Sequence, residues 1–309
     1  MDQQIIVRRS TAARRSKRMY VIVVLLIVLV PVTGVFGIAG YTGWNLTHPA
    51  RAALTSTPEA VGLAYHNVEF TSRQDKLRLK GWLIPAENSD KTMIIAHGYR
   101  GNRTDAPILS LTRDMHLRGY NVLLFDFRGS GESSGDLVTV GQLETRDLLG
   151  AIDYVLSQPK IANKIVLLGF SMGATTSLLA GARDPEVDAV IADAPFADMK
   201  SYLDDNLSVW TDLPSFPFNE AFFIIVPLLT GLEPDQVSPL KEMSSYNGRP
   251  VLLIHGTADS KIPISNSEQL KKVYPEARLL RVPGSDHCDS YQDHPALYLK
   301  TLDQFLAGL

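Results

Sequence analysis

Six short segments of the chain are predominantly apolar, and they recur between residues 93 and 282. Runs of this kind are typical of parallel strands that helices cover on both faces. Two earlier segments, Val68–Thr71 and Leu77–Ile84, alternate in a two-residue period and predict an antiparallel pair of strands. Five of the runs are continuous, and the last contains Arg281: Met93–Ala96, Val122–Phe125, Ile165–Leu168, Ala189–Ala192, Val251–Ile254 and Leu279–Val282.

Helical patterns fill the intervals between these runs. Leu148, Ile152 and Val155 fall on one helix face, and Leu302 and Phe305 do so in the last segment. The order of elements predicts an α/β fold with a doubly wound, mostly parallel sheet. With 309 residues, 45% of them hydrophobic, the chain can bury a large core of this kind. Sites in such sheets form at the carboxyl ends of the strands.

A long apolar segment lies near the N-terminus, and no Asp, Glu, Lys or Arg occurs from Met19 to Ala50. Met19–Gly40 has 22 residues, or about 33 Å as a helix, which is enough to cross a bilayer. We expect an uncleaved transmembrane anchor, because a buried soluble helix is rarely apolar on every face. The alternative is a cleavable signal peptide with Gly37–Gly40 as its cleavage site.

The charge of the chain is distributed unevenly. Residues 1–18 carry a net charge of +5, which leaves −8 for the remainder. Basic residues before an apolar span predict a cytoplasmic N-terminus and a body on the outside, and an acidic body argues against nucleic acid as a partner. The basic residues are Arg8, Arg9, Arg14, Arg15, Lys17 and Arg18. The predicted organisation is a basic cytoplasmic arm (1–18), an anchor (19–40), a linker (41–62) and an α/β domain (63–309).

Residues 196–240 interrupt the alternation of strands and helices with many prolines and aromatic residues. We predict a helical insertion that lies over the carboxyl edge of the sheet as a lid. Trp210 and Phe222 are the predicted lining of an apolar substrate pocket. The alternative is an ordinary long crossover. The other residues of this kind are Pro214, Pro217, Pro227, Pro234, Pro239, Tyr202, Phe216, Phe218 and Phe223.

A Gly-x-Ser-x-Gly motif follows the third continuous run. Ser171 is flanked by Gly169 and Gly173, and the helix-forming segment Ala174–Ala182 comes directly afterwards. In a sharp strand–turn–helix connection the serine oxygen projects at the top of the sheet, and the residues two before and two after it must be very small. The helix N-terminus also favours developing negative charge. Ser171 is therefore the predicted nucleophile.

A serine nucleophile needs a base, and the base needs an orienting carboxylate. Among the seven histidines, His287 lies in a Gly/Pro loop after the last run, which is a suitable place for a mobile base. Asp259 follows the preceding run and is the predicted acid, with Asp193 as the reserve. Asp286 and Asp289 are too close to the base in sequence to orient it well.

An oxyanion requires two backbone donors. The amide of Met172, directly after the serine, is the first predicted donor. The amide of Tyr99 is the second, because the glycines in the loop after Met93–Ala96 allow the backbone to bend towards the substrate. We expect His97 to brace this loop. Cys288 is the only cysteine, which excludes an internal disulfide and a cysteine-based zinc cluster.

The motifs together resemble the α/β-hydrolase superfamily, and within it the serine hydrolases grouped with serine aminopeptidase-like and related bacterial esterases. The resemblance covers roughly residues 65–309. It comprises His97-Gly98-x-x-Gly101-Asn102, Asp126-Phe127-Arg128-Gly129-Ser130-Gly131-Glu132-Ser133, the serine motif, His255-Gly256-x-x-Asp259-x-x-Ile262-Pro263 and Gly284-x-x-His287. It implies ester or related acyl hydrolysis through an acyl-enzyme, without metal or cofactor. The anchor sets the chain apart from many soluble members.

The prediction is a membrane-anchored serine hydrolase, and more specifically a carboxylesterase acting on a small-molecule ester with an apolar acyl group. A peptidase, thioesterase or acyltransferase would use the same residues. A catalytically inactive surface binding module is the alternative from another class. The sequence does not identify the natural substrate or the oligomeric state.

Overall fold

The computed structural model describes the backbone of residues 2–309 and the side chains of residues 14–309. Its eight-stranded sheet has the order β1-β2-β4-β3-β5-β6-β7-β8. Strand β2 runs antiparallel to β1 and to β4, and the other neighbours are parallel. The strands are β1 (His66–Thr71), β2 (Arg78–Ile84), β3 (Lys91–Ala96), β4 (Asn121–Phe125), β5 (Lys164–Phe170), β6 (Ala189–Asp193), β7 (Val251–Gly256) and β8 (Arg278–Val282). The predicted α/β fold class is confirmed.

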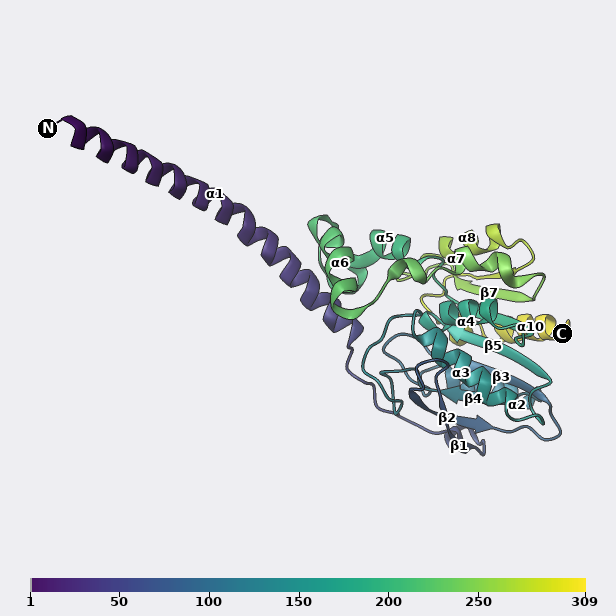
Figure 1. Ribbon diagram of the computed structural model, residues 1–309. Coiled ribbons are helices and arrows are strands. Elements are labelled where there is room, and N and C mark those ends of the chain that lie inside the picture. Colours follow the sequence, from purple (N-terminus) through teal and green to yellow (C-terminus); the bar gives the residue numbers. More distant parts are fainter. Residues whose placement is uncertain (1) are drawn as a thin grey trace.

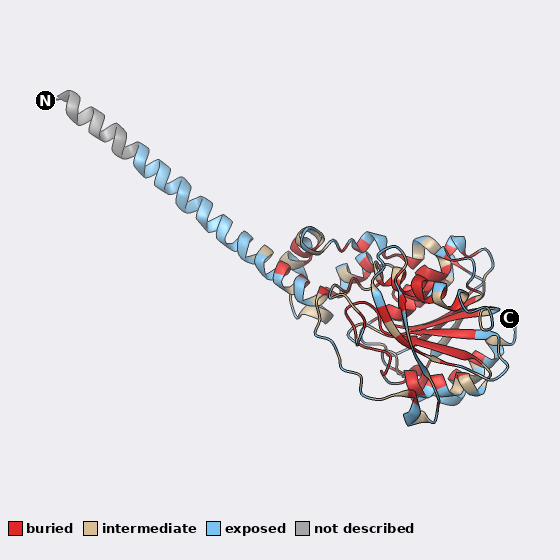
Figure 2. Ribbon diagram, turned by 60° about the horizontal axis from the view of Figure 1, so that its bottom comes forward, coloured by how far each residue is buried: buried red, intermediate tan, exposed pale blue. Residues whose placement is uncertain are grey.

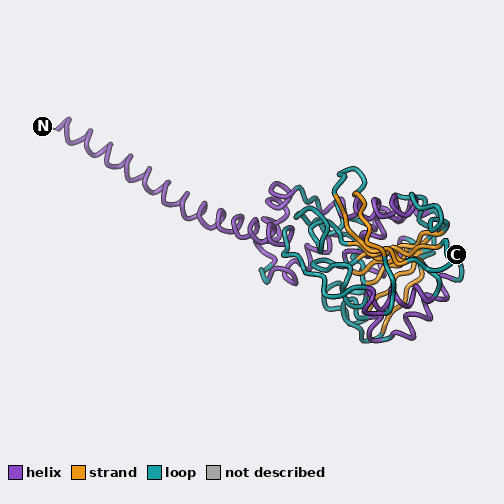
Figure 3. The backbone as a smooth tube through the Cα atoms, turned by 90° about the horizontal axis from the view of Figure 1, so that it is seen from below, coloured by secondary structure: helices purple, strands orange, loops and turns teal. Residues whose placement is uncertain are grey.

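Helices cover both faces of the sheet, which runs through the middle of the body (Figure 3). One face packs against α3 (Glu144–Leu156), α4 (Met172–Arg183) and α8 (Ser265–Val273). The other packs against α2 (Ile108–Leu117), α9 (Ser290–Asp293) and α10 (Pro295–Leu306). A short 3₁₀ turn, η1 (Pro58–Val61), precedes the sheet.

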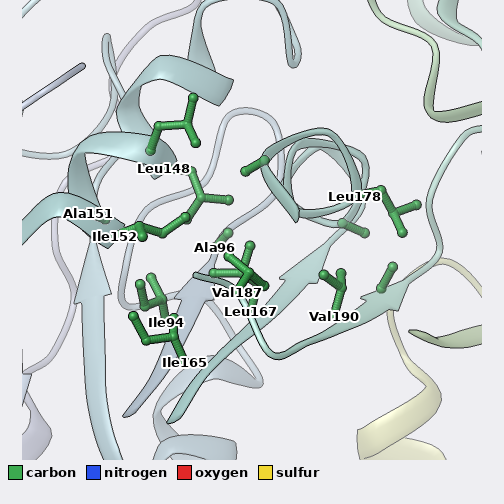
Figure 4. Close-up of a cluster of buried hydrophobic side chains, with 14 of the residues drawn as sticks. Ile94, Ala96, Leu148, Ala151, Ile152, Ile165, Leu167, Leu178, Val187 and Val190 are labelled. Carbon is green, nitrogen blue, oxygen red and sulfur yellow. The ribbon is translucent and has the colours of Figure 1, made fainter. Parts of the chain in front are cut away.

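Successive residues of each central strand enter opposite layers of the core, which explains the continuous apolar runs. On β3, Ile94 faces the α3 and α4 layer, whereas Met93 and Ile95 face the α2 and α10 layer. In the first layer, Leu148 and Ile152 of α3 lie above the β3 and β5 side chains (Figure 4). With both faces buried, every position of these strands favours an apolar residue.

The insertion between β6 and β7 is helical, as predicted. It contains α5 (Met199–Thr211), α6 (Ser215–Thr230), η2 (Pro234–Gln236), α7 (Pro239–Glu242) and η3 (Met243–Tyr246). Asp198 caps the start of α5 by accepting a hydrogen bond from the Ser201 amide at 2.9 Å. Phe196, Tyr202 and Phe222 belong to an apolar cluster that is separate from the two layers of the sheet.

Helix α1 (Asp2–Thr47) projects from the body as a long rod (Figure 1). Its residues 14–34 are exposed (Figure 2). Its segment Arg14–Thr47 is long and apolar enough to cross a membrane. The helix continues beyond the predicted span, so residues 41–47 of the expected linker are helical. The reason is tertiary packing, because Ala39 and the residues after it lie against α6. Of the predicted basic arm, the side chains of residues 1–13 lie outside the described residues.

Candidate active site

Ser171 lies in a one-residue turn between β5 and α4. Its backbone has a φ of 53° and a ψ of −115°, a strained conformation that is rare for any residue other than glycine. A Cβ at Gly169 would collide with the backbone of Gly173, and a Cβ at Gly173 would collide with the carbonyl of Ala96. These glycines therefore allow the turn to be sharp enough to present the serine side chain above the sheet.

The structure brings Ser171, His287 and Asp259 together in one chain of hydrogen bonds. The distance from Ser171 Oγ to His287 Nε2 is 2.9 Å. On the other side of the imidazole ring, His287 Nδ1 lies 2.8 Å from Asp259 Oδ2. Ser171 is 8% exposed, so its oxygen lies in a sheltered but accessible position. An imidazole held between a hydroxyl and a carboxylate can accept the hydroxyl proton.

Asp259 is held by several donors in the loop after β7. Its Oδ1 accepts hydrogen bonds from the amides of Lys261 at 3.0 Å and Ile262 at 2.8 Å. Burial acts to raise the pKa of Asp259, but hydrogen bonds from His255 and His287 outweigh it and hold the pKa well below its usual range. The carboxylate therefore stays ionised, which is the state needed to stabilise a protonated His287.

The other aspartates near the base have different surroundings. Asp193, the reserve acid, is fully buried, and neither of its carboxylate oxygens has a hydrogen-bond partner among the described residues. Its backbone carbonyl accepts a hydrogen bond from the Ser171 amide at 2.8 Å. Asp286 accepts hydrogen bonds from the backbone amides of Ser260 and His287, so it shapes the loop instead of contacting the imidazole ring.

The loop after β3 approaches the serine closely. A Cβ at Gly98 would lie 3.6 Å from Ser171 Cβ. Neither the Tyr99 amide nor the Met172 amide donates to a backbone carbonyl in the described turns and loops. His97 is fully buried and braces this loop, as expected, because its Nε2 accepts a hydrogen bond from the Phe127 amide at 3.0 Å.

Two cavities meet at Ser171. The first, about 70 Å³, is lined almost entirely by apolar side chains and includes both predicted pocket residues, Trp210 and Phe222. The second, about 310 Å³, is more polar and is bordered by His287, Arg100 and Lys261. Trp210 borders both cavities, and its ring lies 5.9 Å from that of Tyr99. An elongated molecule with its reacting carbon at Ser171 would therefore have an apolar arm and a polar arm.

Sequence reasoning missed two contributions to this site. Leu46 and Thr47, at the end of α1, line the apolar cavity, although the predicted helix ended at Gly40. His255 lies behind the acid, with its Nε2 3.3 Å from Asp259 Oδ2 and its Nδ1 2.7 Å from Ser267 Oγ. In the sequence, only the absence of Asp, Glu, Lys and Arg as far as Ala50 indicates that the helix could continue to Leu46 and Thr47.

A strained serine turn between β5 and α4, on a sheet of this order, is the arrangement of the α/β-hydrolase class. A family model for serine aminopeptidase, S33, matches residues 87–231. The chain is 34% identical over 238 residues to the uncharacterized protein YqkD of Bacillus subtilis, which covers 75% of this chain and 76% of that protein. The chain belongs to the serine aminopeptidase S33 family of α/β-hydrolases.

Two further likenesses agree with this assignment. The uncharacterized protein YfhR of Escherichia coli is 32% identical over 251 residues, or 78% of this chain and 80% of that protein. The structure of the Pyrococcus furiosus esterase Pf2001 matches with a TM-score of 0.71 and 27% identity, and covers 85% of this chain and 97% of that chain. The likeness to this esterase structure supports the assignment of the chain as a hydrolase.

Proposed function

We propose that this protein is a serine carboxylesterase that cleaves small-molecule esters through an acyl-enzyme intermediate. The observation that carries the proposal is the uninterrupted hydrogen-bond chain from Ser171 through His287 to Asp259. The likeness to an esterase of known structure supports the same chemistry.

In the proposed first step, Ser171 Oγ attacks the carbonyl carbon of the ester while His287 Nε2 accepts the hydroxyl proton. The negative charge passes to the carbonyl oxygen, where the Tyr99 and Met172 amides donate hydrogen bonds. The carbon–oxygen bond to the alcohol then breaks, and His287 returns the proton to the leaving oxygen. In the second step water replaces the alcohol, and the same proton transfers release the carboxylic acid.

The different linings of the two cavities support one orientation of the substrate. The apolar cavity lined by Trp210 and Phe222 takes the acyl group, and the polar cavity beside His287 takes the alcohol. This orientation places the leaving oxygen near the nitrogen that must protonate it. Arg100 and Lys261 would then border the alcohol portion. The natural substrate is expected to combine an apolar acyl group with a polar alcohol.

Labelling with a fluorophosphonate probe tests the nucleophile. Ser171→Ala should abolish labelling and lower turnover of a p-nitrophenyl ester by several orders of magnitude, because the triad acts as a unit. Ser177→Ala is the matched control, since Ser177 lies on the same α4 helix, is buried and has no side-chain hydrogen-bond partner in the part of the chain that the structure describes. Undiminished labelling of Ser171→Ala would refute the assignment.

A panel of esters, thioesters and amides with the same acyl group separates the proposed activity from peptidase and thioesterase activity. We expect the highest kcat/KM with the oxygen ester. Equal or faster cleavage of the amide would replace the proposal with a peptidase. Transfer of the acyl group to an added alcohol in preference to water would identify an acyltransferase.

We also propose that α1 anchors the enzyme in the cell membrane as a single-pass helix, with the catalytic domain outside. The length and apolar character of Arg14–Thr47 support a span. Arg14, Arg15, Lys17 and Arg18 are exposed at its start, where the positive-inside rule places the cytoplasm.

A further inference from the structure

The end of α1 packs directly against the lid helix α6, beside which it lies in Figure 1. The contact begins near Val35, where the first partly buried side chains occur among residues 14–47 of α1. A Cβ at Gly43 would collide with Val226, and a Cβ at Gly40 would lie 3.2 Å from Leu229. The glycines of α1 therefore let the two helices approach closely, as small residues do between helices in membranes.

The same end of α1 belongs to the active site. Leu46 and Thr47 line the apolar cavity next to Ser171. The Tyr99 hydroxyl donates a hydrogen bond to the Leu46 carbonyl at 2.6 Å, and the Val138 amide donates one to the Thr47 carbonyl at 2.7 Å. The apolar helix is thus joined to the cavity without an intervening flexible linker.

Helix α6 is apolar on its outer face as well as on its inner face. From Ser215 to Thr230 its only charged residue is Glu220. Phe222 is buried at the apolar cavity and Val226 is buried against α1, whereas Ile224 and Leu228 are exposed, Leu228 to 78%. Ile224 and Leu228 are four residues apart and share one face. Phe216 is also exposed but lies at the kink where α6 begins, and Leu229 lies at the edge of the contact with α1. A helix that is apolar all round is typical of a buried or membrane environment.

The position of α6 along α1 indicates that lipid can cover the outer face of α6. Val35 precedes Gly40, the end of the apolar span, by five residues, which is about 8 Å along a helix axis. Helices that lie in the membrane interface bury their apolar faces by about 5–10 Å. The contact between α6 and α1 therefore brings the outer face of α6 to the depth at which lipid chains begin.

We propose that the outer face of α6, made of Ile224 and Leu228, docks into the lipid bilayer beside α1, and that the enzyme takes amphiphilic, membrane-held esters into its apolar cavity from this side. The proposal rests on the esterase function above and names its substrate class. The acyl chain would pass from the bilayer between α6 and the end of α1. The volume of the apolar cavity, about 70 Å³, is smaller than the roughly 300–1,000 Å³ of most ligand pockets. Entry of a long acyl chain therefore requires the side chains between α6 and the end of α1 to move apart.

Turnover by the full-length enzyme in phosphatidylcholine vesicles tests the proposal. The two substrates are p-nitrophenyl butyrate in water and 1-oleoylglycerol held in the bilayer. The double substitution Ile224→Asp and Leu228→Asp should lower kcat/KM for the bilayer-held ester at least tenfold and leave the soluble ester within about twofold. Leu117→Asp is the control, because Leu117 is 69% exposed on α2, away from α1 in Figure 1. Equal effects of the double and control substitutions on the bilayer-held ester would overturn the proposal.

A second measurement, of fluorescence quenching, requires neither enzymatic activity nor the correct folding of a variant with added charges. A fluorophore attached to Leu228→Cys, in a full-length Cys288→Ser background, should be quenched by nitroxide-labelled lipids and protected from aqueous iodide. The same label at Leu117→Cys should show the opposite pattern. Iodide quenching of both sites would overturn the docking, and energy transfer between labelled copies without lipid quenching would assign the face to a second copy of the chain. If the wild type hydrolyses neither ester while lipid quenching occurs, the esterase function fails and the docking stands.

Discussion

Asp259 illustrates how a single carboxylate can set the state of the base. Its contacts with His255, His287 and two backbone amides keep it ionised. Asp259→Asn should preserve the shape but favour the wrong imidazole tautomer, with a loss in kcat on the order of 10⁴, as in the reference serine protease triad. Steady-state kinetics on a soluble ester measures this. Asp193→Asn should retain activity within several-fold, and the reverse result would move the acid to Asp193.

Asp193 should make stability depend on pH. Burial raises its pKa to about 7, although His255 acts in the opposite direction, whereas the pKa in the unfolded chain is about 3.9. Between these values the folded protein holds a proton that the unfolded chain has lost, so stability falls as pH rises through this window. The difference in Tm between Asp193→Asn and wild type should therefore increase from pH 5 to pH 8. Asp136→Asn, at an exposed position, should show no such trend.

At single residues, the sequence predicts positions where a motif constrains the geometry. Gly169 and Gly173 mark the turn because larger residues would collide there, and His287 and Asp259 follow strands whose ends meet at one edge of the sheet. The contact of His255 with Asp259 could not be predicted, since a histidine that ends a buried strand carries no signal of which side chain it faces.

At the scale of elements, we expect the lid residues that line the apolar cavity to make activity depend on the length of the acyl group. Each methylene buried is worth about 0.8 kcal/mol, or about fourfold in kcat/KM, so activity should rise with acyl length until the cavity is full. Trp210→Ala removes a side chain that borders both cavities and should flatten this dependence while leaving acetate esters nearly unchanged. A series of p-nitrophenyl esters measures it.

The matched control is Trp44→Ala, because Trp44 is half exposed on α1 and borders neither cavity. Phe222→Ala is expected to flatten the profile as well, but Phe222 is buried in the lid cluster, where such a truncation costs about 3–5 kcal/mol of stability. Identical chain-length profiles for wild type and Trp210→Ala would contradict the role of this segment as a lid and favour an ordinary crossover connection.

The strands and main helices could be predicted because their apolar periodicity is strong, whereas the end of α1 could not. Residues Tyr41–Thr47 contain Thr, Gly and Asn, which interrupt the apolar run and have low helix propensity. Their helical conformation depends on packing against α6, and that contact joins segments nearly 190 residues apart in the chain. The sequence of residues 41–47 alone does not indicate such a long-range contact.

For the whole molecule, the proposed topology predicts the outcome of proteolysis. Protease added to intact cells should remove the body and leave a short membrane stub, because the basic residues before the span resist translocation. Immunoblots against tags at the two ends measure this. Digestion only after lysis would place the body in the cytoplasm, and an active protein in the medium that starts near Tyr41 would identify a cleaved signal. The burial of Ala39 against α6 favours retention of the segment.

The continuity of α1 with the cavity also fixes a working distance. From Gly40 to Leu46 the helix rises about 9 Å, and the hydrogen bond from Tyr99 to the Leu46 carbonyl holds the body at that height. On the proposed topology, the enzyme could not reach up and down as a domain on a flexible tether does. It would attack only ester groups that lie, or are drawn, about one nanometre from the hydrocarbon edge, and esters in polymers farther from the cell surface would lie out of range.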